Sequence, residues 1–192
     1  TISGNISSAA TNFTGNVTLG DASADTITFN GVVSSNIIPS ANATYNLGNS
    51  SLRWNTVWGL SSSALYADLA ERYAADADYK PGTVLTIGGD EEVTAASVAD
   101  DVFGVVSTAP AYLMNSGAGD DKTHPAVAHA GRVPVRVIGK VFKGQRLISA
   151  GEGMARGASM EECTPFNVIG RSLEDKDFVE SALIEAVVRI SL

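Results

Sequence analysis

Hydrophobic and polar residues alternate along the first third of the chain, but only in very short runs. Val17 and Leu19 lie two positions apart, as do Ile27 and Phe29, so each pair places its side chains on one face of an extended strand. Asn and Gly, which favour turns, interrupt these runs every few positions. The pattern predicts strands of about four to six residues separated by turns.

Strands this short cannot bury a core within one chain, because each offers only one or two apolar side chains and an isolated hairpin is marginal. Three copies around an axis would bury those side chains and pair the open strand edges. We therefore predict that residues 1–60 form a trimeric shaft of short, intertwined strands. A flexible Ser/Gly linker is the alternative, and the regular spacing of the apolar residues argues against it. The expected trimer core includes Val17, Leu19, Ile27, Phe29, Ile37 and Trp54.

Charge separates this stretch from the rest of the chain. Its only charged side chains are Asp21, Asp25 and Arg53, whereas the whole chain has a formal net charge of −8. No Lys/Arg cluster is present, and phosphate binding needs concentrated positive charge, so we expect no nucleic-acid partner.

No apolar run approaches the roughly 20 residues that span a bilayer. The chain begins without Met or a recognisable signal peptide, so we expect it to be part of a longer protein.

Residues 61–79 are expected to form a neck. Three serines at 61–63 interrupt the strand pattern, and the Ala- and Leu-rich segment 64–73 follows. Leu65 and Leu69 have helical spacing, which is compatible with a short helix. An entry strand to the next domain is equally compatible, and both interpretations stay open.

Residues 80–192 contain short β-forming runs separated by glycine turns about every eight to twelve residues, which is typical of sandwiches and barrels. The predicted fold class is therefore all-β: a trimeric fibre with a short-strand shaft and a sandwich- or barrel-like C-terminal knob. The strands expected in the knob are 83–87, 92–94, 102–106, 111–113, 126–130, 133–138, 141–142, 146–148 and 183–192.

Two parts of the first stretch resemble repeat modules found in fibres of tailed phages. One comprises residues 15–21 (GNVTLGD) and 25–31 (DTITFNG). The other comprises 36–40 (NIIPS), 45–48 (YNLG) and 52–55 (LRWN), and it is the more specific because it places aromatic, Gly and Arg-Trp positions over about twenty residues.

The rest of the chain resembles the C-terminal domain of phage fibres, which is similar to G2-type autoproteolytic chaperone domains. The matching segments are 67–73 (ADLAERY), 81–84 (PGTV), 102–107 (VFGVVS), 131–135 (GRVPV), 141–144 (VFKG) and 168–174 (VIGRSLE). The resemblance implies a homotrimer in the virion, on a tail or other surface fibre and outside the cell. Its partners would be a host-cell receptor, either polysaccharide or protein, and other virion proteins towards the N-terminus.

The function expected from this resemblance is host adsorption, or a structural fibre tip, through multivalent binding. The alternative is an intramolecular chaperone that trimerises the shaft, with self-cleavage near Ser61–Ser63. Cleavage would need one of these serines as nucleophile and Asp68 or Glu71 as base. Leu69 stands where the cleaving members have Tyr, so we expect no enzyme.

The polar, Gly-rich loop 115–124 is the expected receptor contact, because loops of this composition are exposed and variable. The candidate residues are Asn115, Ser116, Asp120, Asp121 and His124.

Metal and cofactor sites are not expected within one chain, and an ion held by three copies of one His on a trimer axis stays open. His124 and His129 lie five positions apart, and with Asp120 and Asp121 they match no recognised ligand spacing. The single cysteine, Cys163, is expected to be buried or inert.

Five aromatic residues crowd the region between shaft and knob. We expect them to pack there, in preference to stacking on sugars. They are Tyr45, Trp54, Trp58, Tyr66 and Tyr73.

Overall fold

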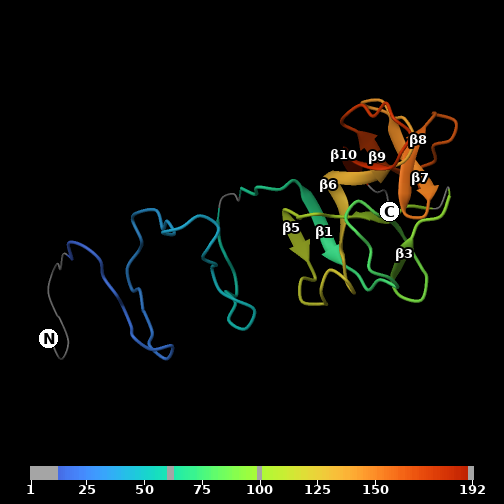
Figure 1. Cartoon of the computed structure of the whole chain (residues 1–192). Helices are drawn as coiled ribbons and strands as arrows, with labels where there is room; N and C mark the ends of the chain where they lie inside the picture. Colours follow the sequence, from blue (N-terminus) through green and yellow to red (C-terminus); the bar gives the residue numbers. More distant parts are fainter. Residues whose placement is uncertain (1–12, 60–62, 99–100, 190–192) are drawn as a thin grey trace. The chain divides into compact units, whose positions relative to one another are not determined.

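The computed structural model describes residues 13–59, 63–98 and 101–189, and it is all-β (Figure 1). The chain divides into two compact units, Thr1–Trp58 and Gly59–Leu192. The described residues contain ten strands, all in the second unit, and no helix. Accordingly, no helix in the described part is long and apolar enough to cross a membrane.

Five strands of the second unit form a closed barrel. Their order is β6, β8, β7, β9 and β10, and β10 pairs with both β9 and β6 to close the ring. The β10–β6 pairing runs over eight residues and is antiparallel. The bounds are β6 Ala126–Val137, β7 Arg146–Gly151, β8 Met154–Ala158, β9 Val168–Ser172 and β10 Ala182–Arg189.

Alternation of side chains along these strands fills the barrel. In β6, Val133, Val135 and Val137 are fully buried, while Arg132 points to the opposite face and is exposed. Each fully buried valine stabilises the fold by roughly 1.5–3 kcal/mol. The other barrel strands contribute Leu147, Ile148, Ala155, Ile169, Ile184, Ala186 and Val188.

The remaining five strands extend from the N-terminal half of β6. One group adds β4, then β2, then β3, while β1 pairs antiparallel with β6 and parallel with β5. The length of β6, 12 residues, lets it serve both this group and the barrel. The bounds are β1 Asp68–Arg72, β2 Val84–Ile87, β3 Val93–Ala95, β4 Gly104–Val106 and β5 Tyr112–Met114.

Gly131 lets β1 approach β6 closely. Its φ is +113°, and a Cβ at this position would clash with the backbone of Ala67 and Asp68. The sequence predicts two strands here, 126–130 and 133–138. That prediction is wrong because Gly131 continues the strand instead of ending it.

Six other predicted strands are confirmed to within a few residues, and the barrel alternative of the predicted knob is the one observed. Segment 64–73 contains strand β1 and not a helix, so the entry-strand interpretation is confirmed. The predicted strand 141–142 is reduced to an isolated bridge between Val141 and Lys176. Strands β8 and β9 were not predicted as strands.

The first unit contains no strand between Phe13 and Trp58, so the expected short strands are not formed in a single chain. Its predicted turns are formed: the Asn49 side chain accepts hydrogen bonds from the N–H groups of Ser51 and Leu52, at 2.9 and 2.8 Å. The side chains expected in the trimer core are exposed, from 48% for Val17 to 85% for Ile37. This unit therefore buries almost none of its apolar surface by itself.

Candidate ligand-binding site

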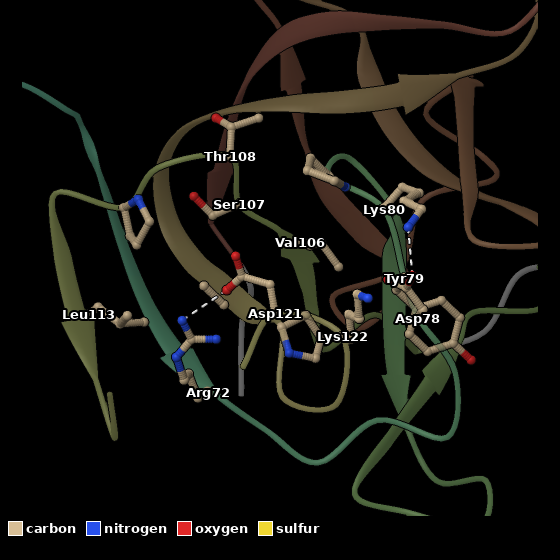
Figure 2. Close-up of a pocket in the computed structure, with 14 residues that line it drawn as sticks. Arg72, Asp78, Tyr79, Lys80, Val106, Ser107, Thr108, Leu113, Asp121 and Lys122 are labelled. Atoms are coloured by element: carbon tan, nitrogen blue, oxygen red, sulfur yellow. Dashed lines mark hydrogen bonds and ion pairs between the residues drawn. The ribbon is translucent and has the colours of Figure 1, made fainter. Parts of the chain in front are cut away.

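Arg72, at the end of β1, holds the loop that precedes β6. Its Nη1 donates a hydrogen bond to the carbonyl oxygen of His124 at 2.6 Å, and its Nη2 forms an ion pair with Asp121 at 2.8 Å (Figure 2). The Arg72 side chain is 14% exposed, whereas that of Asp121 is 86% exposed. Because the carboxylate is solvated, the hydrogen bond to His124 is the stronger anchor of the two.

The loop itself is ordered by its own polar groups. The Asp120 carboxylate accepts hydrogen bonds from the N–H groups of Thr123 and Lys122 and from the Thr123 hydroxyl. These bonds stabilise the charged form, so they hold the pKa of Asp120 below its usual range. Asn115, which has a φ of +51°, donates from Nδ2 to the carbonyl oxygen of Arg72 at 3.1 Å.

The structure thus brings the five candidate receptor-contact residues together in one short loop. Asn115, Ser116, Asp120 and Asp121 are exposed, and His124 is half-buried. Four of them make internal contacts: Asn115, Asp121 and the His124 carbonyl bond to Arg72, and the Asp120 carboxylate accepts hydrogen bonds within the loop. Of the five candidates, Ser116 is the one whose side chain faces solvent without an internal hydrogen bond to the described residues.

A cavity of about 370 Å³ lies between this loop and the turn before β2 (Figure 2). Its polar lining combines three cations and two carboxylates with the hydroxyl groups of two residues that follow β4. Lys80 pairs with Asp78 at 2.7 Å, while the Lys122 ammonium group has no hydrogen bond or ion pair with the described residues. The lining residues are Arg72, Asp78, Tyr79, Lys80, Pro81, Val106, Ser107, Thr108, Pro110, Leu113, Asp121, Lys122, Pro125 and Ala126.

The lining of this cavity combines apolar walls with polar groups, as ligand-binding cavities do. Prolines, Val106 and Leu113 give it apolar walls, and Ser107, Thr108 and Lys122 supply hydrogen-bond donors. No hydrogen bond joins Ser107 to a carboxylate or an imidazole among the described residues, so the nucleophile–base pair of a hydrolase is not assembled there. A small polar ligand with one apolar face would match this lining.

Sequence reasoning missed most of this cavity. Arg72 and Asp121 are 49 positions apart, and Lys80 and Lys122 are 42 apart, so no local pattern links them. They meet because β1 pairs with both β5 and β6, which places the end of β1 beside the loop that joins those two strands.

His129 is part of an aromatic cluster and not of a metal site. Its ring contacts Tyr73 and Phe103 edge-on, with centroids 5.6 and 4.9 Å away. Burial lowers the pKa of His129, and its Nε2 is buried without a hydrogen-bond partner. Within the described ranges, no group of three or more His, Cys, Asp or Glu side chains could hold a metal ion.

Tyr73 is the one member of the predicted aromatic group that packs in this cluster. Burial, with a hydrogen bond to Glu71 at 3.0 Å, raises the pKa of Tyr73 to about 12. The other four are largely exposed: Tyr45, Trp54, Trp58 and Tyr66.

The residues considered for self-cleavage are not assembled in the described structure. Ser61 and Ser62 lie outside the described residues, and Ser63 is exposed. Asp68 is buried with its Oδ2 unpartnered, and Glu71 accepts its hydrogen bond from Tyr73. No described hydrogen bond links Ser63 to either carboxylate.

Cys163 is half-buried, and its thiol donates a hydrogen bond to the carbonyl oxygen of Ser159 at 3.1 Å.

No family model matches this chain, and no curated protein matches it.

Proposed function

We propose that this chain is the distal part of a trimeric virion fibre, in which residues 1–60 form the shaft and the barrel unit forms the knob used in host adsorption. The observation that carries the proposal is the contrast between the two units. The second unit buries a core of apolar side chains within one chain, while the first leaves Phe29, Ile37, Trp54 and similar residues exposed to solvent and has no buried core of its own among its described residues. Exposed apolar residues in such number are typical of surfaces that associate.

The resemblance of the first unit to phage-fibre modules supports three copies and a role in adsorption. Three chains around one axis would cover the exposed side chains and would present three knobs on one assembly. Three weak receptor contacts then act together, since the second and third bind at a high effective concentration. The receptor-binding residues in this proposal are those of the loop at 115–124 together with the cavity beside Arg72 and Lys122.

Light scattering on the purified chain tests the assembly. One chain has a mass of 19.8 kDa, and the proposal predicts a particle of three times that mass. A stable monomer would overturn the proposal.

Adsorption tests the role of the knob. The labelled trimer is expected to bind cells of the host, and periodate or protease treatment of those cells distinguishes a polysaccharide from a protein receptor. The double variant Ser116→Ala/Lys122→Ala should weaken binding, because it removes solvent-facing polar groups of the loop and cavity without touching Arg72. The control, Lys140→Ala, removes an exposed cation elsewhere. Binding that the double variant leaves unchanged would place the receptor contact outside this loop.

A chaperone role for the knob is the second candidate. The second unit has its own buried core, so it can fold before the shaft chains have found one another. Expression of residues 1–58 without the knob tests this role. Trimers that form equally well without the knob would exclude it.

A further inference from the structure

Four arginines lie on the outer surface of the barrel, and three of them form a row across its strands. Arg146 of β7 is paired directly with Arg171 of β9, Arg171 with Val187 of β10, and Val187 with Arg132 of β6. Neighbouring strands are about 4.8 Å apart, so this row extends over roughly 14 Å. Further along the same face, beyond the Pro134–Glu185 pair, the fourth arginine, Arg136, pairs with Leu183. We call these six residues the arginine face: Arg132, Arg136, Arg146, Arg171, Leu183 and Val187.

The arginine face has no internal partner for its charge. The side chains of Arg132, Arg136 and Arg171 make no hydrogen bond or ion pair with the described residues, and Arg146 contacts only the thioether of Met160. Like charges that face each other across two strands are destabilising, and Arg146 and Arg171 are such a pair. An anionic group from outside the barrel would relieve this repulsion.

The composition of the face is that of a protein interface. Leu183 and Val187 are 46% and 43% exposed, and they separate the arginines. Protein interfaces are enriched in Arg and depleted in Lys, because the guanidinium group is planar and weakly hydrated. The cationic residues within the barrel strands are all Arg, whereas Lys140, Lys143 and Lys176 lie between strands.

One carboxylate lies on the same surface without neutralising it. Glu185 faces outward between Leu183 and Val187, and it makes no ion pair with a described arginine. The face therefore keeps an excess of positive charge.

The chain itself carries the complementary charge. Residues 1–125 contain 13 acidic and 4 basic side chains, a formal charge of −9, whereas residues 126–192 contain 8 acidic and 9 basic side chains, a formal charge of +1. A second copy of the chain thus offers acidic groups to the arginine face of the first. Copies joined by the shaft would meet at the millimolar effective concentrations typical of short tethers.

The most available acidic groups are at the tip of the β2–β3 hairpin. Asp90 and Glu91 are exposed, and neither carboxylate has a partner among the described residues. The hairpin is closed by a 3.1 Å hydrogen bond from the N–H of Gly88 to the carbonyl oxygen of Glu92, so the two carboxylates project from a defined turn. Within the second unit, β3 lies well away from β9 and β10 (Figure 1). Within one copy, no ion pair joins Asp90 or Glu91 to a described arginine.

We infer that the arginine face of each knob binds the Asp90–Glu91 hairpin tip of a neighbouring copy. Such a contact joins two different surfaces, and three of them close into a ring around the fibre axis. The inference rests on the proposed trimer, and it adds the surfaces through which the knobs contact one another.

Charge reversal tests the contact in the full chain. The double variant Arg132→Glu/Arg171→Glu places carboxylates against carboxylates. In low salt, it should therefore raise the midpoint of dissociation, the protein concentration at which half the trimer has dissociated, at least tenfold. The effect should shrink in 1 M salt, where the Debye length is about 3 Å. Lys140→Glu makes the same kind of charge change in an exposed loop and should leave the midpoint within about twofold. Adding Asp90→Arg/Glu91→Arg to the double variant should restore most of the lost association.

A covalent test uses a variant that keeps the charge and therefore the fold. Arg171→Lys introduces an amine that a carbodiimide can couple to a carboxylate in direct contact. Mass spectrometry of the cross-linked dimer band should find the introduced lysine joined to Asp90 or Glu91. Lys140 serves as the internal control and should not be joined to them. Coupling to other carboxylates only would overturn the assignment of the hairpin.

These outcomes separate the inference from the function on which it depends. A monomeric wild-type chain would overturn both. A trimer that neither charge reversal nor cross-linking affects would overturn the inference alone. If the charge-reversal variant stayed trimeric but no longer bound alginate beads, the arginine face would be a binding site for an acidic polysaccharide instead.

Discussion

The two units contain the same kinds of β-forming residues but bury them differently. In the barrel, Val135, Leu147 and Ile169 are fully buried by strands of their own chain. In the first unit, Leu19 and Ile27 stand in equally regular alternation, yet they are 61% and 55% exposed. Alternation alone therefore predicts which face a side chain will be on, and not what covers that face.

The difference comes from strand length and closure. The barrel is built around β6, whose 12 residues pair with partners on both sides and leave no open edge. The alternating runs of the first unit span only a few residues between Gly and Asn turns, so a single chain cannot close them into a sheet. In the proposed trimer, other copies of the chain supply these strand partners.

The largest effect should come from removing a buried barrel side chain. Leu147→Ala should lower the free energy of unfolding of the second unit by about 3 kcal/mol, because it leaves a cavity in a closed core. Ile87→Ala on β2, where the side chain is 60% exposed, is the matched control and should cost under about 1 kcal/mol. Urea unfolding measures both, and equal losses would contradict the contrast drawn between buried and exposed positions.

Substitution at Gly131 should be nearly as costly. Gly131→Ala adds a Cβ that clashes with the backbone of Ala67, so we expect a loss of about 2–3 kcal/mol in thermal or urea unfolding. Gly139 has a φ of +77° but open space around its Cβ position, so Gly139→Ala should cost only about 1 kcal/mol. Similar losses at the two glycines would show that the close approach of β1 is not what requires Gly131.

The buried Lys176 tests how polar groups are satisfied in the knob. Its ammonium group donates to the carbonyl oxygens of Gly139 and Phe178, at 2.7 and 2.8 Å, and lies 4.2 Å from the Phe178 ring centroid. Lys176→Met keeps the volume but leaves both carbonyls without their donor, and should cost about 2 kcal/mol. Exposed Lys140→Met should change the unfolding free energy by under about 0.5 kcal/mol. An unchanged stability in Lys176→Met would mean that water replaces the ammonium group at no cost.

The smallest effect should be a pH dependence from His129. Burial lowers its pKa below 6.5 in the folded state, so the unfolded chain binds the proton more readily below that pH. This contribution to stability is complete above pH 6.5 and is lost as the pH falls towards the lower folded pKa. Because the ring is only half-buried, we expect a loss of at most about 1 kcal/mol between pH 7 and pH 5.5. Unfolding of His129→Gln, compared with wild type over this range, should show a flatter profile, and an unchanged slope would assign the effect to other groups.

The sequence was sufficient for the fold class and for most strand positions, because alternation and glycine turns are local signals. The strand predictions were wrong where a contact with residues far away in the sequence determines the strand. Gly131 resembles a strand end until the backbone of Ala67 is placed against it. Strand β8 has the sequence MARGA, whose small side chains give little alternation, and it forms because β7 and β6 lie on either side of it.

The candidate site was predictable only in part. The exposed loop follows from its Gly and Asp content, but its attachment to Arg72 depends on the pairing of β1 with β5 and β6. His129 was considered as a metal ligand because of its residue type, and its contacts with Tyr73 and Phe103 explain it as a packing residue. The residues next to the loop and next to His129 in the sequence do not indicate these contacts.

Hydrogen–deuterium exchange of residues 13–58 tests directly whether other copies of the chain pair with and cover the first unit. In the assembled chain, amides around Val17, Ile27 and Ile37 should be protected, because strands from neighbouring copies pair with them and cover their side chains. Exchange in this unit should be slow at concentrations where the particle is trimeric, as it should be in the barrel. Exchange in the first unit as fast as in an unfolded peptide, with the barrel still protected, would contradict the proposed trimer.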